Sequence, residues 1–382
     1  MHAFSYVLFT LCGQLQPAHP ALSFANIGAS KRNRARMGVF GRVLFATITA
    51  LPAIFAASRV DAAPASEFYK GRVVQVLVGF TAGGGYDLYA RMLARHLGKH
   101  IPGNPAVVIQ NMPGAGSLKA ANYLYNVAPK NGTVLGTFDR GLPMERLLGR
   151  TEGERFDATK FTWIGSVTDE PSVCGFSRRS GIATWQDMKT KPFKVGGAGA
   201  TADDEIYPNV LKALFHLPLR VVSGYPGRAE MVLSIQRGEI DGLCGWSWSS
   251  LMSRDKQLYD AKEIRVPLQL GVEGSLSLPG VPLAGDLTAD PKEKAALKLI
   301  FSRLTIARPF AAPPGLPAER TKALRDGFDA TMMDPEFLAE MKKLALEVRP
   351  QSGVHVEQLI REVYTYPPEI VKIAAEAIKP AR

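Results

Sequence analysis

A glycine-rich turn from Thr81 to Asp87 has the residue types of an anion-binding loop. It follows an apolar, β-branched run at Val73–Val78 and leads into a stretch with helical periodicity that ends at Leu97. Glycines allow the main chain to approach a ligand closely, and the free N–H groups of a first helical turn point toward it with the positive end of the helix dipole. The turn therefore predicts a site for a carboxylate or a phosphate. A glycine turn with a purely structural role is the alternative.

Known nucleotide-binding motifs do not fit this turn. A phosphate-binding loop needs a lysine and a hydroxyl residue where Tyr86, Asp87 and Leu88 stand. The dinucleotide fingerprint also fails, because no glycine or alanine follows Gly85 at the required interval. The turn therefore does not predict a nucleotide cofactor.

A second strand-glycine-helix sequence spans residues 194–204. Its glycines fit one variant of the dinucleotide fingerprint, but the next strand lacks the acid that would bind a ribose. We expect this loop to face the first one as the other half of a clamp. Asp203 and Asp204 either interact favourably with the dipole of the helix that they begin, or one of them contacts a cationic or hydroxyl group of the ligand.

Catalytic and metal-binding patterns are weak in this sequence. Gly245–Ser249 is similar to a nucleophile elbow centred on Ser247, but it ends in serine where a glycine should relieve the turn. His96 and His100 are four residues apart, yet no third ligand is near them in the sequence. We therefore expect a protein that is not an enzyme and that carries no cofactor and no metal.

The first 63 residues have the pattern of a secretory signal peptide. Basic residues lie between positions 31 and 42, an apolar run of about 15 residues follows, and small residues come next at the cleavage position. The run is shorter than the roughly 20 residues that span a bilayer, although a permanent amino-terminal anchor is the alternative. Met37 is a second candidate for the first residue of the translated chain. The pattern predicts export to the periplasm.

Charge favours a small anionic ligand over a nucleic acid. Of the 46 basic and 35 acidic residues, six basic and one acidic fall in the predicted leader, so the remaining chain carries a net charge of +6. It contains no basic tract and no basic patch interleaved with aromatic residues. Two cysteines, Cys174 and Cys244, remain outside the leader, and they either form a disulfide or are two buried thiols.

The remaining residues, about 319 in number, alternate strand and helix patterns, which predicts an α/β doubly wound architecture with two domains. Strands are expected at Val73–Gly79, Ala106–Gln110, Thr133–Thr137, Val173–Phe176, Lys194–Val195, Leu219–Val222, Ile240–Cys244 and Val266–Leu270. Helices are expected at Asp87–Leu97, Ser117–Val127, Thr184–Lys189, Ile206–Phe215, Ala229–Arg237, Pro291–Leu304, Pro317–Met332, Pro335–Leu344 and Val354–Ala377.

Two further segments bear on the site. The proline run from Pro309 to Pro317 is interpreted as a rigid connector. Thr137, Asp139 and Arg140 follow the third strand, and ligands in such folds bind at the carboxyl ends of strands. Arg140 is a candidate for a bidentate clamp on a carboxylate.

Several motifs, in order, resemble those of the periplasmic solute receptors of tripartite tricarboxylate transporters, the Bug or TctC-like proteins. The resemblance extends from about Phe68 to Ala377. The matching segments are Val76–Asp87, Asn111–Gly116, Pro129–Thr137, Gly224–Gly227, Arg237–Asp241 and the region from Arg308 to Glu336.

The resemblance implies a two-domain periplasmic binding fold, type II-like, with the ligand in the cleft between two mostly parallel sheets. Domain 1 would comprise residues 66–167 and 276–382, and domain 2 residues 168–275. By position, the site would contain Ala82, Gly83, Gly84, Gly85, Tyr86, Asp87, Thr137, Asp139, Arg140, Gly197, Ala198, Gly199, Thr201 and Asp203, with Tyr225 and Trp246 as walls.

The implied function is capture of a small carboxylate and its delivery to the membrane permease of a tripartite transporter, by a protein expected to be a monomer. The chain departs from the family pattern at Thr81, at Asn131 and at the pair Asp203-Asp204. Two acids near a second carboxylate would be unfavourable unless they point away, which argues against a tricarboxylate. A monocarboxylate with a polar or cationic far end, or an aromatic acid, is at least as consistent with the sequence. The alternatives are an exported hydrolase of esters or amides using Ser247, and a receptor that signals.

Overall fold

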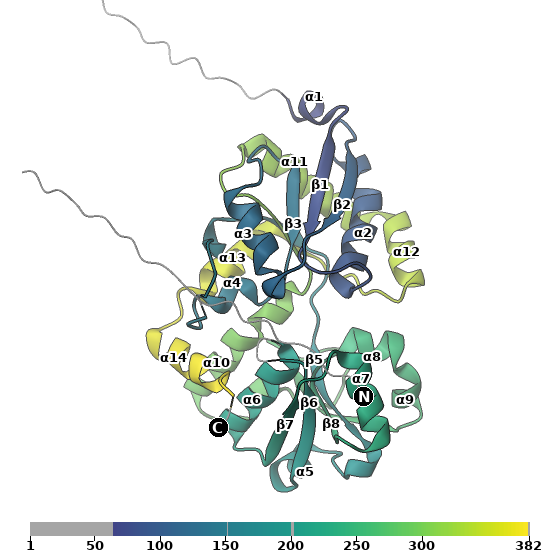
Figure 1. Cartoon of the computed structure of the whole chain (residues 1–382), viewed down its shortest axis with the longest axis vertical. Helices are drawn as coiled ribbons and strands as arrows, with labels where there is room; N and C mark the ends of the chain where they lie inside the picture. Colours follow the sequence, from purple (N-terminus) through teal and green to yellow (C-terminus); the bar gives the residue numbers. More distant parts are fainter. Residues whose placement is uncertain (1–63, 151, 200–201, 381–382) are drawn as a thin grey trace, which may run out of the picture. The chain divides into compact units, whose positions relative to one another are not determined.

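The computed structural model describes residues 64–150, 152–199 and 202–380, so the predicted leader and Thr201 lie outside the described residues. Two mixed β-sheets, each flanked by helices, make up this part of the chain (Figure 1). None of the helices in the described ranges is long and apolar enough to cross a membrane.

The first sheet has the strand order β11-β4-β10-β3-β1-β2. Its strands are β1 (Val73–Val78), β2 (Ala106–Asn111), β3 (Val134–Thr137), β4 (Thr162–Ser166), β10 (Pro309–Ala312) and β11 (Gln351–Ser352). β1 runs parallel to β2 and β3, whereas β10 is antiparallel to β3 and β4. The carboxyl ends of β1, β2 and β3 therefore meet at one edge, where the first glycine loop begins.

The second sheet has the strand order β7-β6-β8-β5-β9. Its strands are β5 (Ser172–Ser177), β6 (Phe193–Gly197), β7 (Leu219–Ser223), β8 (Gly242–Ser247) and β9 (Ile264–Leu270). β6 is parallel to β7 and β8, and β5 is antiparallel to β8 and β9. The chain thus passes from the first sheet to the second after β4 and returns after β9; the domain boundaries given above stay a prediction.

Fourteen α-helices occur in the described residues. They are α1 (Ala65–Tyr69), α2 (Gly85–Leu97), α3 (Leu118–Asn126), α4 (Leu142–Glu145), α5 (Trp185–Thr190), α6 (Asp203–Phe215), α7 (Arg228–Arg237), α8 (Trp248–Arg254), α9 (Lys256–Asp260), α10 (Pro291–Phe301), α11 (Ala318–Met333), α12 (Pro335–Lys343), α13 (Gly353–Val363) and α14 (Pro368–Ala377).

Residue alternation along β1 explains how the helices cover the first sheet. Val74, Val76 and Val78 point into an apolar cluster shared with α2, α11 and α12, while Leu77 points to the opposite face, into a cluster shared with α3 and α13. A strand covered on both faces must be apolar throughout, which is why this run is nearly continuous in the sequence.

The expected strands and helices are present, with two corrections. Pro309–Ala312 is not a connector but β10, an inner strand between β3 and β4. Proline is compatible with that place because it is the first residue of the strand, and the apolar residues after it are buried. The long helix expected at Val354–Ala377 is broken into α13 and α14, because Pro367 and Pro368 cannot continue the first helix and instead begin the second.

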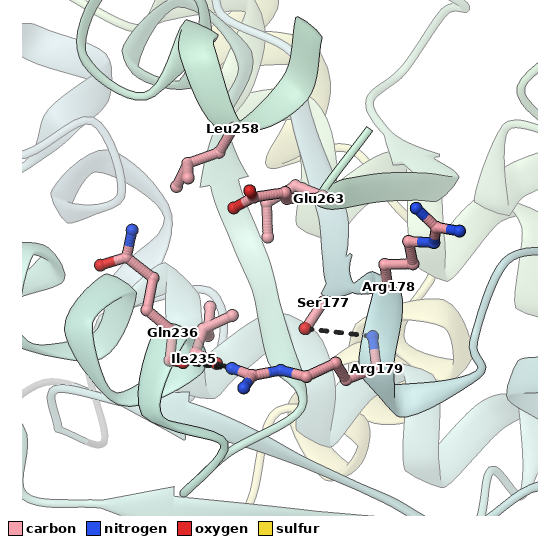
Figure 2. Close-up of a pocket in the computed structure, with 8 residues that line it drawn as sticks. Ser177, Arg178, Arg179, Ile235, Gln236, Leu258 and Glu263 are labelled. Carbon is pink, nitrogen blue, oxygen red and sulfur yellow. Dashed lines mark hydrogen bonds between the residues drawn. The ribbon is translucent and has the colours of Figure 1, made fainter. Parts of the chain in front are cut away.

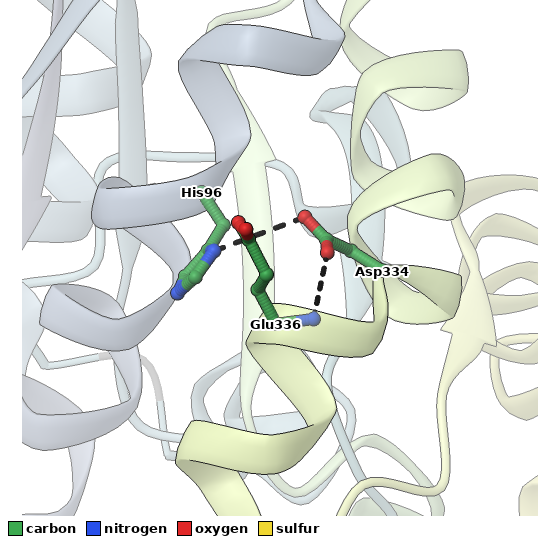
Figure 3. Close-up of side chains that lie close together, drawn as sticks. All are labelled: His96, Asp334 and Glu336. Carbon is green, nitrogen blue, oxygen red and sulfur yellow. Dashed lines mark hydrogen bonds and ion pairs between the residues drawn. The ribbon is translucent and has the colours of Figure 1, made fainter.

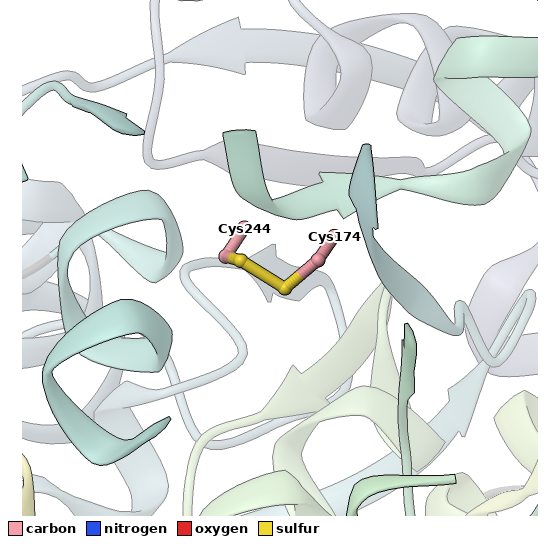
Figure 4. The surroundings of a disulfide bond; sticks show 2 residues. All are labelled: Cys174 and Cys244. Atoms are coloured by element: carbon pink, nitrogen blue, oxygen red, sulfur yellow. A yellow bond between two sulfur atoms is a disulfide. The ribbon is translucent and has the colours of Figure 1, made fainter. Parts of the chain in front are cut away.

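The structure resolves the alternatives for the cysteines. Cys174 and Cys244 occupy paired positions on the neighbouring strands β5 and β8, and they form a disulfide that is fully buried (Figure 4). The bond lies within the second sheet and closes a chain segment of 70 residues.

Removal of this disulfide should destabilise the fold. Closing a loop of this length restricts the unfolded chain by about 4 kcal/mol in the chain-entropy view, and measured losses are commonly about 2–5 kcal/mol. We expect the double variant C174A/C244A to lose about 2–4 kcal/mol of unfolding free energy in urea, and reduced wild-type protein to lose a similar amount. Equal urea midpoints for the oxidised, reduced and double-variant proteins would contradict a structural role for the bond.

Candidate functional site

The first glycine loop leaves main-chain donors available at the start of α2. Residues 81–85 are exposed, Gly83 has a φ of +85°, and α2 begins at Gly85. The residue before the helix, Gly84, has no side chain that could cap it. Because the first N–H groups of a helix have no partner within the helix, they remain available to an anionic acceptor.

Asp87 holds this loop in place. Its carboxylate accepts hydrogen bonds from the main-chain N–H of Gly83 at 2.8 Å, from Arg91 Nε at 2.8 Å and from Asn111 Nδ2 at 2.8 Å. Asn111 also donates to the carbonyl of Phe80 at 3.0 Å. The loop, the helix and the end of β2 are thus joined through one buried carboxylate, so the contacts of Asp87 make it a positioning residue rather than a direct ligand contact.

The second glycine loop is built in the same way. Asp204, in the first turn of α6, accepts a hydrogen bond from the main-chain N–H of Ala198 at 2.9 Å. Gly199 adopts a φ of +149°, and the residue before the helix, Ala202, provides no side-chain cap. Each loop is therefore fastened by an aspartate that follows it and opens onto the start of a helix.

The end of β3 approaches both loops. Arg140 donates its main-chain N–H to the hydroxyl of Tyr86 at 3.0 Å, and its guanidinium is paired with Asp203 and, at 3.4 Å, with Glu170. Thr137 is buried, and its hydroxyl has no hydrogen-bond partner among the described residues. The sequence suggested that Arg140 is free to clamp a carboxylate. In the structure its charge is instead neutralised by two acids of the chain itself.

These residues belong to a larger group of charges that we call the arginine-acid cluster, in which Arg140, Glu170 and Arg303 are buried and Asp203 and Arg308 are partly buried. Arg308 lies 3.0 Å from Glu170, and Arg303 lies 3.7 Å from Asp203. Burial alone would raise the pKa of Glu170, but Arg308 and Arg140 lower it to about 2. The cluster links residues that follow β3 and β4 to the first turn of α6, and hence the two sheets.

Glu170, Arg303 and Arg308 were not among the predicted site residues. Each lies outside the glycine motifs, and only the tertiary fold brings them beside Arg140 and Asp203. The Arg308 side chain also reaches the first loop, since a Cβ atom on Gly85 would lie 3.4 Å from its guanidinium. A signal was present in the sequence, because Arg308 directly precedes the proline of the carboxy-terminal motif.

Arg228 is a further residue that the sequence reasoning missed. It is the first residue of α7, directly after the Gly224–Gly227 motif, and it donates to the carbonyl of Gly245 at 3.3 Å. Its Nε is buried without a hydrogen-bond partner, and no described carboxylate lies within 4 Å of its guanidinium. Burial lowers its pKa, while the more distant Asp204 and Glu170 raise it. Arg228 thus has unused donor capacity near the cluster.

The aromatic residues predicted for the site have different environments. Tyr86 stacks on Phe80 with 4.3 Å between the ring centroids, and Arg308 lies over the same tyrosine ring at 4.8 Å. Tyr225 is half-buried beside an apolar cluster. Trp246, in contrast, is completely buried in that cluster with Val173. The prediction for Trp246 is corrected, because β8 is covered on both faces and its tryptophan packs in the core.

The remaining predicted residues lie in the two loops and after β3. Ala82 lies in the exposed first loop, and Gly197 is the buried last residue of β6. Asp139 follows β3 and accepts a hydrogen bond from the N–H of Gly141 at 2.7 Å. Burial and the neighbouring Asp203 raise its pKa, which Arg303 opposes.

A hydrolase site at Ser247 is not supported. The hydroxyls of Ser247 and Ser249 donate to Glu170, and Ser247 Oγ accepts from the N–H of Ser250 at the start of α8. None of its hydrogen-bond partners among the described residues is a histidine. Ser247 therefore helps to satisfy a buried carboxylate and to cap a helix.

A cavity with a volume of about 420 Å³ lies between the ends of β5 and α7 (Figure 2). Two arginines, Arg178 and Arg179, border it. Arg179 donates to the carbonyls of Ile235 and Gln236 near the end of α7, where a cation is favoured by the helix dipole. Its guanidinium is thus committed to the fold, and none of the residues that line this cavity belongs to a glycine loop.

Comparison with known proteins places this geometry in a class. No protein-family model matches the chain. A curated protein of Cupriavidus necator, described as a UPF0065 protein in the gbd 5' region, is 22% identical over 317 residues, which cover 79% of this chain and 87% of that protein.

Solved structures give the clearer likeness. A TctC solute-binding protein from Polaromonas matches with a TM-score of 0.62 and 16% identity, covering 80% of this chain and 99% of that chain. An R. palustris protein with adipate matches with a TM-score of 0.58 and 19% identity, over 80% and 97% of the two chains. MatC from Rhodopseudomonas palustris with bound malate matches with a TM-score of 0.56 and 18% identity, over 81% and 99%.

These likenesses show the fold, which is that of the two-domain periplasmic binding proteins. Within that class, the fold is that of the TctC and Bug solute-binding proteins. The two-domain binding fold expected from the sequence, and the resemblance on which it was based, are confirmed. Each sheet is mixed rather than mostly parallel, because β10 and β5 pair antiparallel with both of their neighbours.

The role of Asp87 can be tested through pH. Hydrogen bonds from Arg91, together with those from Gly83 and Asn111, outweigh the effect of burial and lower its pKa from 3.8 to about 2. A depressed pKa stabilises the folded state above the ordinary pKa, and this stabilisation is lost as the pH falls toward 2. The difference in unfolding free energy between wild type and D87N should therefore shrink by about 1 kcal/mol between about pH 6 and about pH 3.

Urea unfolding at the two pH values measures this difference. D326N provides a matched control, since Asp326 is an exposed acid that pairs with Lys322 four residues away. Its difference from wild type should be small at both pH values, because an exposed ion pair contributes little to stability. A difference for D87N that is the same at both pH values would show that Asp87 does not hold the loop through its charge.

Proposed function

We propose that this chain is an extracytoplasmic solute-binding receptor that captures a small carboxylate and delivers it to the permease of a tripartite-type membrane transporter. One observation carries the proposal: two glycine loops, one on each sheet, are fastened by Asp87 and Asp204 and open onto the first turns of α2 and α6. The arginine-acid cluster connects the two. Two sets of main-chain donors with nearby arginines suit an anionic ligand.

The acids near the site do not exclude a second carboxylate. Asp203 is paired with Arg140 and Arg303, which offset its charge, and the Asp204 carboxylate is turned toward the N–H of Ala198, with Arg228 acting on it from a longer distance. This removes the objection to a ligand with two carboxylates that the sequence raised. The adipate and malate named for two structural relatives are both dicarboxylates, and we extend that ligand class to this chain.

Ligand binding would act by selecting the closed arrangement of the two lobes. A carboxylate that accepts hydrogen bonds from both loops interacts with more donors when the loops are close, and this differential contact shifts the population toward closure. The residues that contact it would be Ala82, Gly83, Gly84, Gly85, Ala198, Gly199 and Thr201, together with Thr137 and Arg228.

Export and the absence of catalysis are part of the same proposal. The predicted leader would direct the chain to the periplasm, where the buried disulfide could form. The structural relatives named above are solute-binding proteins, which supports a receptor without catalytic activity, expected to act as a monomer.

A ligand screen tests the receptor function. The chain from about Ala65 onward should show a saturable rise in melting temperature with one or a few small mono- or dicarboxylates, because a ligand that binds only the folded form stabilises it. The variant G84L should abolish the rise. The loop has room for the substitution, since a Cβ atom on Gly84 would approach nothing closer than 3.8 Å, but the leucine would fill the mouth of the loop.

The matched control is G285L, where a Cβ atom would have nothing within 4 Å and the residue is remote in sequence from both loops. It should respond to the ligand as wild type does. If no carboxylate shifts the melting temperature, and the protein instead hydrolyses an ester in a way that S247A abolishes, the receptor function is wrong.

Arg228 provides a second test once a ligand is found. A charge-assisted hydrogen bond contributes about 1.5–3 kcal/mol, so R228M should weaken binding by roughly 10- to 100-fold in calorimetry. R254M, which removes an exposed arginine from α8, should leave affinity unchanged. Equal affinities for R228M and wild type would exclude Arg228 from the binding site.

A further inference from the structure

A second group of chemistry-bearing side chains lies away from the glycine loops, between the end of α2 and the start of α12. His96 lies on α2, Asp334 precedes α12, and Glu336 lies in its first turn (Figure 3). The two helices pack side by side (Figure 1). The sequence offers no further potential ligand close to His96 and His100. In the fold, Asp334 and Glu336 supply such ligands from a segment more than 230 residues away.

The geometry of this group suits a metal ion. One ligand atom from each of His96, Asp334 and Glu336 lies within 4.8 Å of the others. His96 Nδ1 is 3.8 Å from Asp334 Oδ2, too far for a hydrogen bond. Two ligands of a tetrahedral zinc ion, each bound at about 2.0–2.1 Å, are separated by roughly 3.3–3.5 Å, so only a small movement is needed.

The other nitrogen of His96 is already held as in a metal site. Its Nε2 lies 2.9 Å from Glu340 Oε2, and the ring packs edge-on against Phe337. A neutral imidazole that donates from Nε2 to a carboxylate has its lone pair on Nδ1, and that atom faces Asp334. Carboxylate partners on the remote nitrogen orient metal-binding histidines in this way.

A cation already occupies the position between the two carboxylates. Lys99 Nζ lies 2.6 Å from Asp334 Oδ2 and 2.6 Å from Glu336 Oε2. Asp334 Oδ2 also lies 2.9 Å from His100 Nε2. The lysine side chain is about 43% exposed and can swing into solvent.

We propose that this group is a binding site for a divalent transition metal of the zinc type. His96 Nδ1 and one oxygen each from Asp334 and Glu336 would bind the ion, water would complete the coordination, and the Lys99 ammonium would be displaced. A mixed set of imidazole and carboxylate ligands favours zinc over magnesium and calcium, which prefer oxygen ligands alone. An ion there would join α2, which carries the first glycine loop at its other end, to α12.

The test is isothermal titration of the untagged protein, from about Ala65 onward, with zinc chloride. Wild type should bind one ion, and H96A should weaken binding at least tenfold. E336Q should do the same, and because Glu336 is largely exposed this variant guards against a folding defect in H96A. H355A, which removes an exposed histidine from α13, should bind as wild type does.

A variant of Lys99 tests whether this group is a metal site or only a network of ion pairs. If the lysine competes with the ion, K99M should bind zinc several-fold more tightly than wild type, and chelation should reverse the accompanying rise in melting temperature. If neither wild type nor K99M binds zinc, or if H96A and E336Q bind it as tightly as wild type, the proposal is overturned. A response to magnesium equal to that to zinc would also overturn it.

Discussion

The buried ion pairs of Arg140 are the constraint on which the arrangement of the site depends. Moving an arginine out of water is costly, and the cost is recovered only when acids with good geometry surround it. Asp203 comes from the first turn of α6, and Glu170 from the connection between β4 and β5. Arg140 itself follows β3 of the other sheet. Satisfying one guanidinium therefore requires three segments that are distant in the chain to meet at one point.

The glycine loops have restraints of their own. Main-chain N–H groups form an anion site only when the loop that carries them is held in one conformation, and glycines by themselves leave it free. Asp87 and Asp204 supply the fixed points, one for each loop. The two roles are thus divided: the acid after each loop restrains the backbone, and the main-chain N–H groups of the loop remain available to a ligand.

Charge neutralisation explains how a site with several acids can still suit an anion. Glu170 is held ionised by Arg308 and Arg140, and it also accepts hydrogen bonds from Ser247 and Ser249. The serines that resembled a nucleophile elbow are therefore engaged in satisfying a buried carboxylate. With these acids engaged within the chain, unused donor capacity remains at main-chain N–H groups, at the Thr137 hydroxyl and at Arg228.

Local patterns in the sequence determined the alternation of strands and helices, both glycine loops and the fold class, because periodicity and glycine placement act over a few residues. They did not predict the strand Pro309–Ala312. A run of prolines usually indicates a connector, but this segment is buried between two strands of the sheet. Only the tertiary structure decided the pairing of Arg140, the burial of Trp246 and the meeting of His96 with Asp334. Ion pairs and core packing join residues far apart in the chain, and no local pattern records which partners the fold will bring together.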